Sequence, residues 1–141
     1  MKKFLTGLAL LAMAFTASAW DQRPVNPVAA CQVHSPYGWA QTQRTATPIC
    51  REAYLVAYDA PVRIPVYVAY TLQPQNALGC FPRTNAFVAD QSVQGGATPS
   101  DYVGTGYDKG HAAPDGDLSW DQQVEYESFL MTNMYPQKGS L

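Results

Sequence analysis

Two runs rich in β-branched and aromatic residues stand on either side of a turn near the middle of the chain. The first covers residues 53–58, the second covers residues 64–72, and the Asp-Ala-Pro sequence at 59–61 separates them. Runs of this composition bounded by turn residues are typical of β-strands. The pattern predicts two antiparallel strands. Pro65 has no backbone N–H, so it restricts the second strand to an edge or to a start at this proline.

The C-terminal part of the sequence predicts a short helix followed by an extended segment. Ser119 and Gln122 resemble a capping box that opens a helix ending at about Glu127. Residues 129–134 follow as an extended segment, and Pro136 is expected to break regular pairing. Three acids of the helix are interpreted as a solvated face: Asp121, Glu125 and Glu127. With the central strand pair, these elements predict an α+β fold.

The N-terminus has the features of a signal peptide. Lys2 and Lys3 precede an apolar run at 4–15, and Ala17-Ser18-Ala19 has the small-x-small pattern of a cleavage site. A run of roughly 12 residues is shorter than the roughly 20 that a spanning helix requires. We therefore expect cleavage after residue 19, no membrane segment in the mature protein, and export to the periplasm or the medium. The mature domain is then 20–141, and it begins with an irregular surface segment, 20–48.

The chain has three cysteines, Cys31, Cys50 and Cys80. In an oxidising compartment at least one disulfide is expected, and the odd number leaves one thiol. A bridge between Cys31 and Cys50 would close a short loop, but the sequence leaves all three pairings open. Metal binding is not indicated for these cysteines, because the chain has no CxxC motif and no nearby histidine pair.

The charge balance limits how the chain could bind nucleic acid. Nine basic and eleven acidic residues give a net charge of −2, and loss of residues 1–19 would remove two lysines and no acids. A protein that covers nucleic acid with a broad surface usually has a strongly basic face. Any nucleic-acid contact is therefore expected to be local.

Residues 107–111 combine a base, a cation and a glycine. Glycines before this segment and Pro114 after it predict an extended conformation, in which alternation places Lys109 and His111 on one face. A neutral imidazole can take a proton from water near neutral pH, and an ammonium group can hold a phosphate oxygen. Gly110 is expected to leave room for substrate near the backbone. Spacing alone is equally compatible with a structural histidine and a solvated lysine.

Two motifs carry a family resemblance. The segment GYDKGHAAPDGD at 106–117, followed by ESFLMTNMYPQ at 127–137, resembles the DNA/RNA non-specific endonucleases, the secreted sugar-non-specific nucleases of the ββα-metal class. Their signature is an Asp-Arg-Gly-His segment and then a Ser/Thr-Asn-Met-x-Pro-Gln segment. Lys109 stands where the family has arginine, which keeps the charge and loses a bidentate phosphate contact. Weaker similarity covers most of the mature chain.

The resemblance implies a metal-dependent endonuclease that hydrolyses phosphodiester bonds of DNA and RNA without sequence specificity. It implies that His111 is the general base and that Lys109 binds the phosphate and stabilises its charge. It also implies that Asn133 and Gln137 support the site and bind substrate. The cofactor implied is one divalent ion, usually Mg²⁺, which assists departure of the 3′ oxygen.

The resemblance also implies that part of the metal site lies outside this sequence. The family's metal-binding asparagine is on the helix after the Pro-Gln segment, beyond Leu141. We therefore expect a C-terminally incomplete domain without the metal-site helix, no metal ligand among the residues present, and low stability of the chain alone. The alternative is a non-catalytic exported module that binds nucleic acid or phosphate. Oligomeric state and DNA versus RNA preference stay open.

Overall fold

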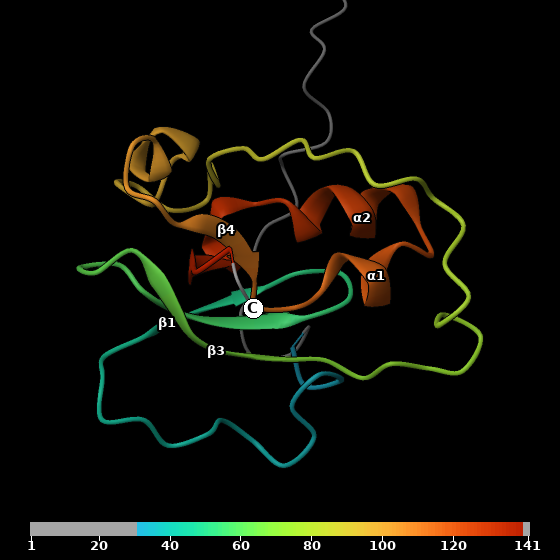
Figure 1. Ribbon diagram of the computed structural model, residues 1–141. Helices are drawn as coiled ribbons and strands as arrows, with labels where there is room; N and C mark the ends of the chain where they lie inside the picture. Colours follow the sequence, from blue (N-terminus) through green and yellow to red (C-terminus); the bar gives the residue numbers. More distant parts are fainter. Residues whose placement is uncertain (1–30, 140–141) are drawn as a thin grey trace, which may run out of the picture.

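The computed structural model describes residues 31–139 (Figure 1). The expected signal peptide lies outside the described residues. The described part is an α+β arrangement of two antiparallel sheets, two short α-helices and two 3-10 helices. In chain order the elements are β1 (Thr47–Cys50), β2 (Leu55–Asp59), β3 (Ile64–Ala69), η1 (Pro99–Tyr102), β4 (Asp108–His111), α1 (Asp115–Leu118), α2 (Gln122–Ser128), η2 (Met131–Asn133) and β5 (Met134–Gln137).

The first sheet has three strands in the order β1-β2-β3. The predicted antiparallel pair is confirmed as β2 and β3, with Leu55 opposite Ala69 and Asp59 opposite Ile64. Pro65 lies in β3, an edge strand, which fits its missing N–H. The sequence interpretation missed β1, which pairs with β2 from Thr47 to Cys50. This strand has only four residues and begins inside the segment interpreted as irregular.

The core lies between one face of this sheet and the two α-helices. Tyr54, Val56 and Tyr58 are buried and form a cluster with Leu118 of α1 and Val124 of α2. Figure 1 shows both helices on this side of the sheet. Leu55 and Ala57, of opposite parity, are also buried. The segment before β1 passes the other face, where Trp39, Thr42 and Ala46 line a pocket together with Ala57.

The second sheet pairs β4 with β5 and carries both family motifs. Asp108 lies opposite Gln137, Lys109 opposite Pro136, and His111 opposite Met134. The extended conformation predicted for residues 107–111 is confirmed for β4. The extended segment predicted at 129–134 is wrong in its bounds, because residues 131–133 form η2 and the strand begins at Met134. Pro136 does not break the pairing, because β5 has a partner on one side only within the described residues.

The helix after the first motif begins differently from the prediction. Asp121, not Ser119, is the N-cap of α2, and its Oδ1 accepts hydrogen bonds from the backbone N–H groups of Gln123 (2.7 Å) and Val124 (3.1 Å). The acids are not a solvated face. Glu125 is only 3% exposed, and its Oε1 accepts hydrogen bonds from the N–H (2.9 Å) and the hydroxyl (3.1 Å) of Thr84.

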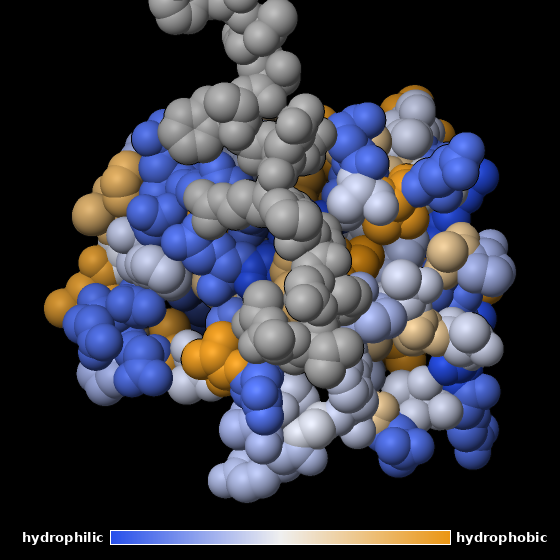
Figure 2. Space-filling model, turned by 180° about the vertical axis from the view of Figure 1, so that it is seen from behind, coloured by the Kyte–Doolittle hydropathy of each residue, from blue (hydrophilic) through white to orange (hydrophobic). Residues whose placement is uncertain are grey.

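A disulfide joins Cys31 to Cys50, with their Cα atoms 5.4 Å apart, while Cys80 is free and exposed. The bridge ties the N-terminal segment to the end of β1. Among residues 31–139, no helix has the length and apolar character needed to cross a membrane. On the face drawn in Figure 2, the visible hydrophobic residues lie in small groups between hydrophilic ones.

Candidate active site

β4 presents Lys109 and His111 on one side, as their spacing predicts. Both side chains contact the same ring: the Lys109 Nζ lies 4.8 Å from the centroid of Phe87, and the His111 ring lies 5.7 Å from it. Phe87 comes from the loop before η1, so the loop and the strand together form this surface. The ammonium and the imidazole are therefore neighbours across one aromatic ring.

His111 is half-buried between two phenylalanines. Its ring meets Phe129 edge-on at 4.9 Å, and Phe87 and Phe129 contact each other at 5.0 Å. The Nε2 atom is shielded from solvent and has no hydrogen-bond partner among the described residues. A buried polar atom without a partner is unusual in a folded protein, and a catalytic role is one of the explanations for it.

The environment of His111 keeps its ring neutral. Burial and, to a smaller extent, the Arg83 guanidinium lower the pKa of His111, the carboxylate of Asp115 acts in the opposite direction, and the net result is a pKa of about 4. The imidazole is therefore unprotonated at neutral pH, which is the form that can accept a proton.

Arg83 is a site residue that the sequence analysis did not single out. Its guanidinium lies 4.9 Å from the centroid of Phe129, on the ring that also packs against His111. Its Nη1 donates to Asp115 Oδ2 at 3.0 Å, and its Nε donates to Asn85 Oδ1 at 2.8 Å. The segment 78–89 has no strand or helix pattern, so no signal in the sequence marks this arginine. Arg83 and Lys109 thus place two cations on the two rings that hold His111.

Asp115 is the acidic member of this group. It is 8% exposed, its Oδ2 binds Arg83, and its Oδ1 has no hydrogen-bond partner among the described residues. One carboxylate oxygen is therefore available beside the imidazole.

Asn133 is fully buried and clamps the chain just after His111. Its side-chain Oδ1 accepts from Ala113 N–H at 2.8 Å, and its Nδ2 donates to the carbonyls of Ala113 and Ser128, each at 2.9 Å. Its backbone carbonyl accepts from Ala112 N–H at 2.8 Å. All of these contacts are to backbone groups, so Asn133 sets the position of the segment between β4 and α1.

Gln137 lies against Gly110, the glycine between the two site residues. A Cβ atom at Gly110 would be 2.8 Å from the Cβ and 2.5 Å from the Oε1 of Gln137. Gly110 is buried, so the expectation that it leaves room for substrate is wrong. The missing side chain makes room for Gln137 instead.

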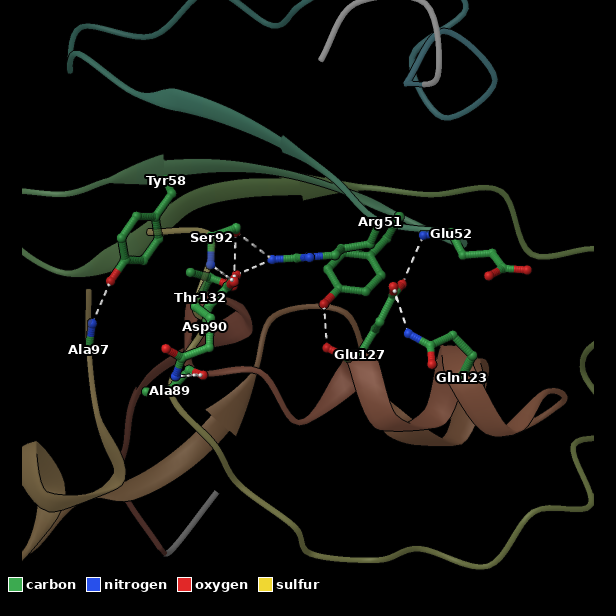
Figure 3. A network of polar contacts seen from close by, with 12 residues as sticks. Arg51, Glu52, Tyr58, Ala89, Asp90, Ser92, Ala97, Gln123, Glu127 and Thr132 are labelled. Carbon is green, nitrogen blue, oxygen red and sulfur yellow. Dashed lines mark hydrogen bonds and ion pairs between the residues drawn. The ribbon is translucent and has the colours of Figure 1, made fainter. Parts of the chain in front are cut away.

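A polar network around Asp90 contacts Thr132 of the second motif (Figure 3). Asp90 is ion-paired with Arg51, accepts from the Thr132 hydroxyl at 2.6 Å, and accepts from the Ser92 N–H at 3.0 Å. Burial alone would raise the pKa of Asp90, but Arg51 and the hydrogen bonds from Ser92 and Thr132 outweigh it and lower that pKa. Thr132 precedes Asn133, so the network fixes the residue next to the clamp.

Comparisons with known proteins identify the family. The sequence profile of the DNA/RNA non-specific endonuclease family matches residues 36–141. Endonuclease G, mitochondrial, of Homo sapiens is 34% identical over 90 residues, which cover 62% of this chain and 30% of that protein. A nuclease of Nostoc sp. is 36% identical over 90 residues, covering 62% and 32%. Nuclease EXOG, mitochondrial, of Xenopus laevis is 31% identical over 149 aligned positions, covering 96% and 41%.

A solved structure agrees with the sequence comparisons. A chain in the crystal structure of the EndoG/EndoGI complex, which describes the mechanism of EndoG inhibition, superposes with a TM-score of 0.65 at 25% identity, covering 77% of this chain and 45% of that one. The chain belongs to the DNA/RNA non-specific endonuclease family, and its fold is consistent with the ββα-metal fold. It spans about a third of the length of the first two relatives named above.

The described residues do not make a complete site for the divalent ion that the family implies. Residues 31–139 contain no group of three His, Cys, Asp or Glu side chains that could hold a metal. Asp115 offers one free carboxylate oxygen, but its other oxygen binds the Arg83 cation. Mg²⁺ prefers about six oxygen ligands, several of them water. One carboxylate oxygen beside an arginine does not supply that set.

Proposed function

We propose that this chain carries the catalytic strand pair of an exported, metal-dependent endonuclease that hydrolyses phosphodiester bonds of DNA and RNA without sequence specificity. The observation that supports it most is His111, a neutral imidazole with an unpartnered Nε2, held between rings that carry Lys109 and Arg83. A proton acceptor flanked by two cations suits a reaction in which water attacks an anionic phosphodiester.

In the proposed reaction His111 is the general base. Its Nε2 takes a proton from water while the water oxygen forms a bond to phosphorus. The bond from phosphorus to the 3′ oxygen breaks, and that oxygen leaves with the electron pair and takes a proton from solvent. The products are a 5′-phosphate and a 3′-hydroxyl. Lys109 and Arg83 hold the phosphate oxygens and stabilise the added negative charge.

The proposed base must become accessible to water when substrate binds, because Nε2 is shielded in this conformation. Arg83 has a side chain that is 45% exposed, and it lies on Phe129, the ring that also packs against His111. Catalytic hydrogen bonds often form fully only in the substrate complex.

Asn133 and Gln137 act in this proposal as positioning residues. Asn133 holds the backbone that follows His111, and Gln137 lies against Gly110. A misplacement of about 1 Å can cost 10²-fold in rate, so a clamp one residue beyond the base affects catalysis without touching substrate. Gln137 is partly exposed and could also contact the nucleic acid.

The cofactor of the proposed enzyme is Mg²⁺ or another divalent cation. This rests on the family and not on the described residues, which do not supply the ligands. Export rests on the N-terminal sequence pattern and on the disulfide, which is typical of oxidising compartments. The domain boundary at residue 20 follows from the same pattern.

The test is plasmid cutting by the protein extended through the metal-site helix that the family implies, and by His111→Ala in the same extended protein, each with Mg²⁺ and with a chelator. We expect the substitution to reduce cutting by about 10²- to 10⁴-fold, the usual contribution of a general base. His34→Gln is the matched control, because His34 is a loop histidine that contacts the carbonyl of Glu52. Undiminished cutting by His111→Ala would remove His111 from the proposed role.

The second candidate function is a non-catalytic module that binds nucleic acid or phosphate. The observation that favours it is the shielding of Nε2, because a base that water cannot reach does no chemistry. Such a module would retard labelled DNA in a gel without cutting it, with or without Mg²⁺. Substitution of Lys109 would weaken that binding, whereas substitution of His111 would not.

A further inference from the structure

A pocket of about 230 Å³ lies between the turn that joins β2 to β3 and the helix η1. Figure 1 shows this turn and η1 at the same end of the molecule. Its lining includes Arg63, Ile64, Tyr102, Thr105, Tyr107 and Pro136. None of them is one of the residues to which the proposed function gives a catalytic role, His111, Lys109 and Arg83.

The pocket begins directly beside Lys109. Pro136, in its wall, pairs with Lys109 across the β4–β5 ladder. Tyr102, also in its wall, has its ring centroid 5.9 Å from the Lys109 Nζ. Tyr107 is two residues before Lys109 on the same chain segment. A phosphate held by Lys109 would therefore place the adjoining nucleotide at the mouth of this pocket.

The chemistry of the lining suits a nucleobase better than a second phosphate. The two charged residues in the lining, Arg63 and Asp101, pair with each other, with Arg63 Nη1 3.3 Å from Asp101 Oδ1. Two tyrosines, Tyr102 and Tyr107, line the pocket, and Tyr107 is 45% exposed. Bases of single strands stack on aromatic side chains with little sequence preference, because every base has a π face.

The size of the pocket limits its occupant to one ring system. Pockets that enclose whole drug-sized ligands measure roughly 300–1,000 Å³, and this pocket is smaller. A base stacked within a duplex has both faces covered and would have to leave the stack first. An unpaired base meets no such cost.

We propose that this pocket receives the nucleobase next to the phosphate held by Lys109, on an unpaired strand, and that Tyr107 stacks on that base. The proposal rests on the proposed function for the position of the phosphate, but it concerns binding and not hydrolysis. Binding of a base in this pocket would favour single-stranded regions of nucleic acid without selecting their sequence.

The test is binding under a chelator, which separates it from cutting. Fluorescence anisotropy would compare a labelled thymidine strand of about ten nucleotides, within the range of about 4–16 that single-strand sites cover, with an abasic strand of the same length and charge. We expect the unsubstituted chain to bind the base-containing strand roughly ten-fold more tightly, the order of one stacked base. Tyr107→Ala should lose that preference, and Tyr107→Phe should keep it.

Tyr126→Ala is the matched control, because Tyr126 is 43% exposed on α2 and does not line the pocket. It should keep the preference of the unsubstituted chain. Equal binding of the two strands by the unsubstituted chain, no binding of either, or an unchanged preference in Tyr107→Ala would each overturn the pocket proposal. A clear base preference, together with undiminished cutting by His111→Ala in the extended protein, would support the pocket and overturn the proposed role of His111 instead.

Discussion

Two hydrogen bonds join the side-chain amide of Asn133 to the backbone N–H and carbonyl of Ala113. Asn133 Oδ1 accepts from the Ala113 N–H at 2.8 Å, and its Nδ2 donates to the Ala113 carbonyl at 2.9 Å. This contact joins the second family motif to the residue two positions after His111. The backbone that follows the proposed base is therefore fixed by the last residue of η2.

Asn133→Ala should destabilise the protein by about 2–5 kcal/mol. The substitution leaves buried groups of Ala113 and Ser128 without partners, and each unsatisfied group costs about 1–3 kcal/mol. Urea unfolding measures the change. Gln75→Ala, at an exposed position, is the control and should stay within about 0.5 kcal/mol of the unsubstituted chain. A similarly small change for Asn133→Ala would contradict the clamp.

Gly110→Ala should weaken the β4–β5 pair. The new Cβ would lie 2.8 Å from the Cβ of Gln137, and this backbone-proximal atom cannot move aside as a side-chain tip can. Overpacking of this kind costs about 1–3 kcal/mol. Thermal unfolding measures it, with Gly116→Ala as the control, because a Cβ at Gly116 meets nothing within 4 Å. Equal midpoints for the two variants would argue against the close approach.

Local sequence patterns predicted the parts of the fold that depend on neighbours in the chain. The strand pair on either side of residues 59–61 follows from composition and a turn, and the shared face of Lys109 and His111 follows from the two-residue period of a strand. The family motifs added the antiparallel sheet and the site. These features need only information that lies within a few residues.

The features that the sequence did not predict depend on distant contacts. Arg83 belongs to the site because its segment packs on Phe129, and nothing in its local sequence indicates this. Glu125 has the sequence context of a surface acid, but it is buried and accepts a hydrogen bond from Thr84, which is far from it in the sequence. The strand β1 forms by pairing with the edge of β2. Tertiary contacts override local propensity in each case.

Loss of the disulfide should destabilise the chain by about 3 kcal/mol, the estimate for a loop of roughly 15 residues. The bridge between Cys31 and Cys50 closes a loop with a sequence separation of 19. The double variant Cys31→Ser with Cys50→Ser should therefore unfold at lower urea concentration than the oxidised chain. Cys80→Ser is the control and should not change the midpoint, because Cys80 is free and exposed. Coincident curves for the double variant and the oxidised chain would exclude a stabilising bridge.

Arg83 and Asp115 should shift the pKa of His111 in opposite directions. Arg83→Ala removes a cation and should raise that pKa from about 4 toward its ordinary value, whereas Asp115→Asn removes an anion and should lower it. NMR titration of the His111 ring protons measures both, with His34→Gln to assign the two histidines. Arg44→Ala is the control, because Arg44 pairs with Asp59 instead. An unshifted titration in Arg83→Ala would show that the guanidinium does not act on the imidazole.

His111 should make the stability of the folded chain fall as the pH drops from about 6.5 to about 4. Its pKa is about 4 in the folded state and 6.5 in an exposed chain, so within this window the unfolded state binds a proton that the folded state does not. Stability from the neutral ring is fully present above pH 6.5 and is lost as the pH falls toward 4. Comparing urea unfolding of the unsubstituted chain and His111→Gln across this range isolates the effect, because His34 and the carboxylates are common to both. The difference between the two proteins should shrink steadily in acid, and a constant difference would mean that His111 titrates in the folded protein as an exposed histidine does.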